Sequence, residues 1–303
     1  MRPTALFFGY LFLCLALAAA LTVPVMQSGW IDYAPHRVMG RLAQLFILLG
    51  LWPFLRLVGV ADRDALGLGL ARRSFLVRVG LGWLLGVLIL ALLMAALLGL
   101  GVRVPDLPAS GLVATIAEKA VAALIGGLLI GLLEEAFFRG ALFSAIRRRG
   151  SLAEAVVFSA LLYALVHVLK PHQLPAGVAF DWAGAQAMFL QVFTGLLQWK
   201  HVDTLAALFM AGVLLGLVRE RSGHIAWCIG LHAGWVFVIQ VSRRLTDGDE
   251  GAGLAFLAGD YDGVIGWLAV LWLALLSWLV WRFGVAPGRG AATSPPEAAP
   301  GPR

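Results

Sequence analysis

Long apolar runs separated by short polar connections dominate the chain. A run of about 18 or more apolar residues predicts a helix that spans a bilayer. Eight runs of about this length lie at roughly 5–26, 39–60, 74–101, 112–146, 152–169, 203–219, 225–241 and 264–283. The pattern therefore predicts an all-α fold, a polytopic membrane helical bundle with about eight transmembrane helices.

Two stretches leave alternatives open. Arg2 precedes the first run, and "ALAAALT" within residues 1–26 resembles the cleavage site of a signal peptide, but the run is long and continues past that site. The segment 171–202 is semi-apolar and is compatible with a re-entrant or interfacial helix. The first run is interpreted as a retained span, and the pattern assigns no role to the second stretch.

Composition supports a membrane protein. Of the 303 residues, 61% are hydrophobic and 13% are charged, against roughly a quarter charged in ordinary soluble domains. The formal net charge of +6 does not indicate nucleic acid, because the positive residues lie between apolar runs and form no stripe with interleaved aromatics. The expected partner is the lipid bilayer, with no nucleic acid.

The positions of Lys and Arg predict the orientation, because cytoplasmic connections carry an excess of them. With eight spans, 14 fall on one side and 8 on the other. The larger group is Arg2, Arg56, Arg63, Arg72, Arg73, Arg78, Arg147, Arg148, Arg149, Arg219, Arg221, Arg282, Arg289 and Arg303. Both termini are therefore expected in the cytoplasm, and a composition rich in Leu, Ala, Gly and Arg favours a bacterial inner membrane.

The chain is expected to form one integral membrane domain over residues 1–284. The remaining tail, 285–303, is rich in Gly, Pro and Ala and has no periodic apolar face. Such a segment buries too little apolar surface to fold. A disordered cytoplasmic tail is predicted.

Three charged residues interrupt the fourth run, in "GLLIGLLEEAFFRGALFSAI". An ionised group in a membrane is costly, so it is expected to be paired and functional. Glu135 and Arg139 are four residues apart on one helix face and can pair. Glu134 is rotated from Glu135 by about 100° around the helix axis and points to a different neighbour. One glutamate is thus expected to be structural and the other free for chemistry.

Two histidines on other runs can reach the same depth. At about 1.5 Å per helical residue, Glu134 lies about 20 Å from Arg147, His167 about 24 Å from Ser151, and His232 about 16 Å from Arg221. The fourth, fifth and seventh helices can therefore meet in one polar site. The other histidines, His36, His172, His201 and His224, are interpreted as solvated or interfacial.

The motifs around these residues resemble those of a protease family. "EEAFFR" resembles an EExxxR motif, "YALVH" an (F/Y)xxxH motif and "HAGWV" an HxxxN motif. In this order, on separate spans, they are similar to the CPBP family, the CAAX-protease and bacteriocin-processing intramembrane proteases, also called Abi. The resemblance covers about residues 112–240.

The resemblance implies an intramembrane endopeptidase that hydrolyses a peptide bond in a membrane-associated peptide or protein. It makes Glu134 the general base, Glu135 and Arg139 the rest of the first motif, and His167 and His232 the two active-site histidines. In this reading Glu134 activates water, His167 holds the water and His232 polarises the carbonyl.

The chain departs from the family at Val236, where the family commonly has Asn. That Asn is thought to stabilise the oxyanion, and loss of one such donor costs about 10²–10³ in rate. Gln240 or His232 would have to supply a substitute donor. The alternative is a non-catalytic relative that acts as a scaffold or immunity factor.

The cofactor and the reaction class stay open at this point. The family is described both with and without a metal, and in a metal variant Glu134, His167 and His232 would bind Zn²⁺. Buried Glu, His and Arg also build proton relays, so a proton-coupled transporter is a further alternative. The chain shows no inverted repeat of the kind that carriers often have.

Overall fold

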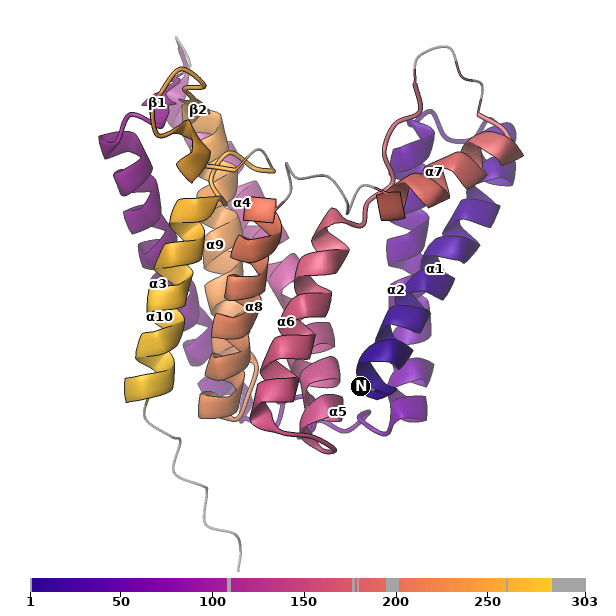
Figure 1. The fold of residues 1–303 in the computed structure, drawn as a ribbon, viewed down its shortest axis with the longest axis horizontal. Helices are drawn as coiled ribbons and strands as arrows, with labels where there is room; N and C mark the ends of the chain where they lie inside the picture. The colour runs from indigo at the N-terminus through magenta and orange to yellow at the C-terminus, as the bar shows by residue number, and fades with distance from the viewer. Residues whose placement is uncertain are drawn as a thin grey trace, which may run out of the picture.

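The computed structural model describes residues 2–107, 110–175, 178, 180–194, 202–259 and 261–284. This part of the chain is a bundle of helices with two very short strands (Figure 1). The α-helices are α1 Arg2–Gln27, α2 Pro35–Val58, α3 Arg72–Gly99, α4 Leu112–Glu135, α5 Phe143–Arg147, α6 Leu152–Val168, α7 Trp182–Thr194, α8 Val202–Ser222, α9 Ala226–Leu245 and α10 Trp267–Phe283. A π-helix, η1 Ala136–Leu142, joins α4 to α5, and a 3-10 turn, η4 Ala255–Leu257, precedes α10.

The helices begin and end at residues suited to those positions. Ser151 and Glu154 form a capping box at the start of α6, in which each side chain accepts a hydrogen bond from the other's backbone N–H. Gly59 caps the end of α2, in the left-handed conformation at φ 75° that glycine adopts without steric cost. These residues help to determine where the apolar helices begin and end.

Helices occupy all eight of the ranges expected to span the membrane, which confirms the polytopic helical bundle. In the described part of the chain, five helical stretches are long and apolar enough to cross a membrane: Arg2–Gln27, Pro35–Val58, Arg72–Gly99, Leu112–Arg147 and Val202–Ser222. The helices Leu152–Val168 and Trp267–Phe283 are apolar but shorter. α9 is not among the five, and it carries the polar residues His232 and Gln240 and two arginines in its last turn.

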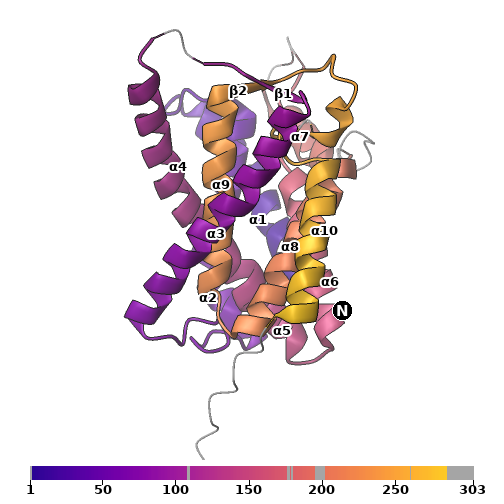
Figure 2. The same ribbon diagram turned by 90° about the vertical axis from the view of Figure 1, so that its left-hand side faces the viewer.

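Helix α9 packs against both α3 and α4 (Figure 2). Glycines permit these close contacts, because a methyl group on Gly82 of α3 would lie 2.9 Å from the carbonyl oxygen of Trp227 on α9. A methyl group on Gly131 of α4 would lie 3.0 Å from the carbonyl oxygen of Ile229. Small residues spaced by four, such as Gly82 and Gly86, let helix backbones approach in membranes. α9 is thereby held between two neighbours.

A second, smaller core lies between α1, α2 and α7 (Figure 1). Met188 and Ala185 of α7 are buried there with Ala18 of α1 and Met39 of α2. The described part of the segment 171–202 thus contains one 13-residue helix that packs on the N-terminal pair. Residues 195–201 and the tail 285–303 lie outside the described residues.

The two strands join the loops at one end of the bundle. β1 Arg103–Pro105 pairs antiparallel with β2 Thr246–Gly248, with Arg103 opposite Gly248. The buried Arg103 side chain donates to the Thr246 hydroxyl at 2.8 Å and to the Gly263 carbonyl at 2.8 Å. This cluster ties the ends of α3 and α9 to the loop before α10.

Candidate active site

The two glutamates lie where α4 changes into the π-helix. α4 ends at Glu135, and residues Phe137 to Leu142 of η1 are all buried. A π-helix widens the turn by one residue, which re-aims side chains, and such turns are frequent at functional sites. The local geometry therefore presents Glu134, Glu135 and Arg139 to different neighbours.

Glu135 and Arg139 form a fully buried ion pair. Arg139 Nη1 donates to Glu135 Oε1 at 3.1 Å, and both side chains have no exposed surface. The same carboxylate oxygen lies 2.8 Å from His232 Nδ1 of α9. An ionised carboxylate can only accept, so His232 donates from Nδ1 and its Nε2 points away from Glu135. The pair thus fixes the orientation of the imidazole.

Glu134 faces both histidines. Its Oε2 lies 3.5 Å from His167 Nε2 and 3.9 Å from His232 Nε2, and the side chain is 31% exposed. His167 Nδ1 lies 2.8 Å from the Tyr163 carbonyl oxygen one turn earlier, so that nitrogen also donates. Two Nε2 atoms therefore converge on one carboxylate oxygen. The structure brings together the three helices expected to share a polar site.

The ring of Tyr163 fills the space among these groups. Its centroid lies 4.4 Å from that of His167 and 6.1 Å from that of His232. Arg139 Cζ lies 4.3 Å from the same centroid, within the range of a cation–π contact. The side chain is only 3% exposed. Tyr163 therefore restricts the positions of both imidazoles and of the guanidinium.

Arg219 supports the π-helix from α8, a role that the sequence pattern does not reveal. From the sequence, Arg219 is expected among the charged residues at the membrane boundary. In the structure, however, this residue is only 8% exposed. Its Nε donates to the Arg139 carbonyl at 3.2 Å and its Nη2 to the Ala65 carbonyl at 3.3 Å. The Ser144 hydroxyl also donates to Ala65. These hydrogen bonds hold the connection between α2 and α3 against the π-helix.

Val236 lies in the seam between α9 and α4. It follows His232 by one turn and is half-buried, and its Cγ1 lies 3.5 Å from the position of a methyl group on Gly127. Gln240, one turn further, is exposed. The residue at the position of the usual Asn thus faces the helix that carries both glutamates.

The structure corrects the interpretation of one other histidine. His224, expected to be solvated or interfacial, is only 7% exposed, and its Nδ1 has no hydrogen-bond partner in the described part of the chain. Burial, with the positive charges of Arg78 and Arg219, lowers the pKa of His224 to about 4. His172 is exposed and His36 half-buried, whereas His201 lies outside the described residues.

The three residues expected to bind a metal carry suitable donor atoms. Glu134, His167 and His232 offer one carboxylate and two Nε2 atoms, and each imidazole donates through Nδ1 to an acceptor, as metal-binding histidines usually do. Among the described residues, however, no group of three or more His, Cys, Asp or Glu side chains is arranged to hold a metal ion. The three donors therefore do not form a ready metal site in this geometry.

Comparison with known proteins agrees with these motifs. Residues 115–238 match the family model described as type II CAAX prenyl endopeptidase Rce1-like. This stretch runs from α4 to α9 and includes both glutamates, Arg139 and both histidines. No curated protein and no solved structure matches the chain. Within this integral membrane bundle of apolar helices, residues 115–238 thus match an Rce1-like model of the CPBP family, which supports a CAAX-type intramembrane protease at the level of the family.

Proposed function

We propose that this chain is an intramembrane endopeptidase in which Glu134 activates the attacking water. The observation that carries the proposal is the position of Glu134 Oε2 beside the Nε2 atoms of His167 and His232. Peptide hydrolysis needs a base for water, a group that stabilises the carbonyl oxygen and an acid for the leaving nitrogen. These three residues can supply all three functions.

The reaction begins with a water held between Glu134 and His167. Glu134 accepts one proton of the water, and His167 Nε2 accepts a hydrogen bond from the other. The water oxygen then bonds to the carbonyl carbon of the substrate, and the electron pair of the C=O bond moves to the oxygen. Glu134 next gives its proton to the amide nitrogen as the C–N bond breaks and the oxyanion re-forms the carbonyl, which releases a carboxylic acid and an amine.

His232 is the proposed partner of the carbonyl oxygen. His232 donates from Nδ1 to Glu135, and when its ring carries a second proton it also donates from Nε2 to the developing oxyanion. Glu135 and Arg139 act through His232, by fixing the direction of its ring.

A metal remains an alternative source of the activated water. Bound to Glu134, His167 and His232, Zn²⁺ would supply Lewis acidity. These residues offer suitable donor types, and no step above depends on a metal. A chelator therefore belongs in the test of the mechanism.

The test is cleavage of membrane-associated peptides by the purified full-length chain in lipid nanodiscs. The panel contains prenylated CAAX peptides, unmodified leader-type peptides and a transmembrane peptide, each with and without chelator. Glu134→Gln keeps the shape of the side chain but cannot accept the proton, and we expect it to lower turnover at least about 10²-fold. Glu118→Gln is the matched control, because Glu118 is an exposed glutamate on the same helix.

The results separate the alternatives. Near wild-type turnover by a folded Glu134→Gln variant would remove Glu134 from the role of base. Loss of turnover with chelator, restored by Zn²⁺, would favour the metal variant. Cleavage of none of the peptides would favour the second candidate, a non-catalytic family relative, for which Val236 in place of the usual Asn is the specific observation.

We also propose that the chain lies in a bacterial inner membrane with both termini in the cytoplasm. The start of α1 and the end of α10 lie at the same end of the bundle (Figure 1). That end also holds α5, whose last residue is Arg147, and the start of α3. Labelling of single cysteines at Arg2 and Arg282 from each side of sealed vesicles tests the orientation.

A further inference from the structure

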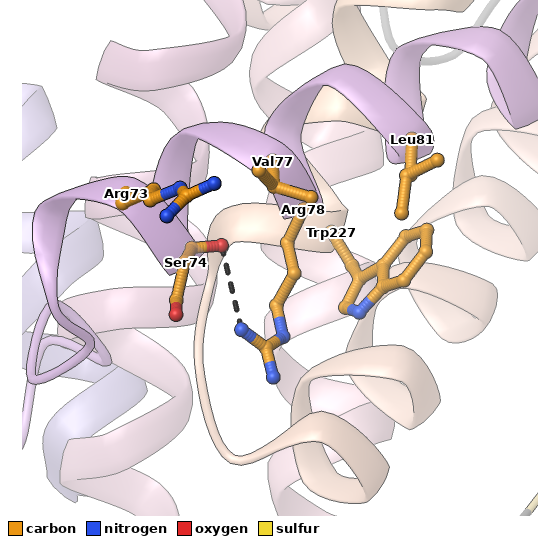
Figure 3. A pocket seen from close by; sticks show the side chains of 6 residues that line it. All are labelled: Arg73, Ser74, Val77, Arg78, Leu81 and Trp227. Carbon is orange, nitrogen blue, oxygen red and sulfur yellow. Dashed lines mark hydrogen bonds between the residues drawn. The ribbon is translucent and has the colours of Figure 1, made fainter.

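A pocket lies at the first turns of α3 and α9, on the surface of the bundle (Figure 3). It has a volume of about 580 Å³ and is lined by Arg73, Ser74, Val77, Arg78, Leu81 and Trp227. Five of these residues come from α3 and follow one face of that helix, and Trp227 completes the wall from α9. None of them belongs to the candidate active site.

The pocket changes from charged to apolar along α3. Ser74 and the two arginines stand at the start of the helix, and Leu81 lies two turns further along it. The helix has 28 residues and is about 42 Å long at 1.5 Å per residue. The charged start of this helix is expected in the headgroup layer, because an ionised side chain is costly within the hydrocarbon core. The pocket is thus expected at the boundary between headgroups and acyl chains, where tryptophan is enriched.

Its two arginines carry uncompensated charge. Arg78 Nη1 reaches only the Ser74 carbonyl, at 3.4 Å, and neither Arg73 nor Arg78 forms an ion pair within the part of the chain that the structure describes. By contrast, Arg147 and Arg148 at the same end pair with Glu220 and Asp62.

The neighbourhood of the arginines is also positive. The charge of Arg78 contributes to the lowered pKa of the buried His224, and Arg219 adds a further positive charge. On α8, Glu220 pairs with Arg147, and no residue that lines the pocket is acidic. An anion would find two unpaired guanidinium groups there.

We propose that this pocket binds the phosphate-bearing headgroup of an anionic phospholipid. Guanidinium groups bind phosphate oxygens through paired, charge-assisted hydrogen bonds. Basic pockets between transmembrane helices at the cytoplasmic side are suited to such headgroups. Val77, Leu81 and Trp227 supply the apolar wall along which the glycerol and the first acyl carbons lie.

The ligand would bridge two helices that position the active site. α3 and α9 pack through glycines, and His232 lies on α9 about 7.5 Å along the axis from Trp227 at 1.5 Å per residue. A headgroup bound by both helices stabilises their contact, because it binds the folded state alone. This inference depends on the membrane bundle and not on the proposed protease activity.

The test measures thermal unfolding of the purified full-length chain in a mild detergent. The additives are phosphatidylglycerol, phosphatidylcholine at the same mole fraction, and inorganic phosphate. We expect phosphatidylglycerol to raise the midpoint temperature with a saturating dependence, and the other two to have little effect. An equal rise with inorganic phosphate would mean a site for free anions, and an equal rise with phosphatidylcholine would mean bulk solvation by lipid. Either result would overturn the proposal.

Two double variants locate the effect. Arg73→Gln with Arg78→Gln should weaken the apparent affinity for phosphatidylglycerol at least tenfold. Arg63→Gln with Arg72→Gln removes the same charge from exposed residues outside the pocket and should keep the affinity. Equal losses of affinity in both double variants would indicate general electrostatic attraction and would overturn the proposed binding site.

A second measurement tests the proposal even if the Arg73, Arg78 variant folds poorly. Native mass spectrometry counts phosphatidylglycerol molecules retained by the folded population alone. Wild type and the Arg63, Arg72 variant should retain one more lipid than the Arg73, Arg78 variant. Equal retention by all three proteins would contradict the proposal even where stabilities differ.

Discussion

At the scale of single residues, the site depends on the Glu135 carboxylate, which Arg139 and His232 share. Glu135 Oε1 contacts both Arg139 Nη1 and His232 Nδ1, while Glu134 Oε2 contacts the Nε2 faces of the two histidines. The adjacent glutamates therefore have different environments, one fully buried and one partly exposed. Their substitutions should differ accordingly.

Glu135→Gln should reduce both stability and turnover. The variant leaves the buried guanidinium of Arg139 without a counter-charge, and breaking a buried pair in this way costs about 3–5 kcal/mol. It also weakens the hydrogen bond that orients His232. Thermal unfolding and peptide cleavage in nanodiscs measure the two effects. Wild-type stability would show that Arg139 finds another partner, and Glu118→Gln is again the control.

Val236→Asn should raise turnover by up to about tenfold, because a donor one turn from His232 can add to the oxyanion site. The side chain lies between α9 and α4, so the new amide remains in that seam. The gain should vanish in a Glu134→Gln background. Lower turnover in the single variant would mean that the seam is already packed around valine and that another group donates.

At the scale of elements, glycines set the distance between the helices. A methyl group on Gly86 of α3 would lie 2.9 Å from Leu231 Cα on α9, whereas around Gly80 of the same helix nothing lies within 4 Å. Leu231 is the neighbour of His232. The packing of α3 is therefore connected to the position of the imidazole.

Gly86→Ala should destabilise the protein by about 1–3 kcal/mol, because overpacking forces backbones apart. It should also lower turnover, since α9 carries His232. Gly80→Ala is the matched control and should be neutral or stabilising, as alanine is the better helix former by about 1 kcal/mol. Equal effects of the two substitutions on the unfolding temperature would refute a role for close packing at Gly86.

At the scale of the whole molecule, one buried histidine links stability to pH. Because the pKa of His224 is lowered to about 4 in the folded state, the unfolded chain binds more protons between that value and the ordinary pKa of about 6.5. Stability rises with pH wherever the unfolded state binds more protons. The contribution of His224 is thus present above pH 6.5 and is lost as the pH falls towards 4.

The unfolding temperature should therefore decrease less steeply between pH 6.5 and 4.5 in His224→Gln than in wild type. Arg78 and Arg219 are the charges that act on this histidine. His172→Gln, at an exposed position, is the control and should keep the wild-type slope. Identical slopes in all three proteins would show that His224 is not buried in its neutral form.

Much of the fold could be predicted from the chain alone. The apolar runs are long enough that bilayer thickness dictates helices, and all eight expected ranges are helical. The spacing of Glu135 and Arg139 predicts their pairing, because residues four apart share a helix face. The order of the three motifs pointed to the family that the match at residues 115–238 supports.

Other features depended on contacts between distant segments. Arg219 has the sequence context of a boundary charge, but the connection between α2 and α3 buries it by supplying the Ala65 carbonyl. His224 is also buried, in the turn between α8 and α9, where the neighbouring Ile225 N–H donates to the Gly67 carbonyl of the connection between α2 and α3. Burial of a polar side chain depends on what packs against it, which hydropathy along the chain does not report.

The sequence by itself determined the helices, their approximate ends and the identity of the polar groups, because these follow from local periodicity and from the cost of charge in a membrane. Only the tertiary structure decided which nitrogen of each histidine faces Glu134, because that depends on Glu135 and on the Tyr163 carbonyl. It also decided that the chain passes through a π-helix after Glu135, since packing of Gly140 against Leu66 and the bond from Arg219 act on that turn from other segments.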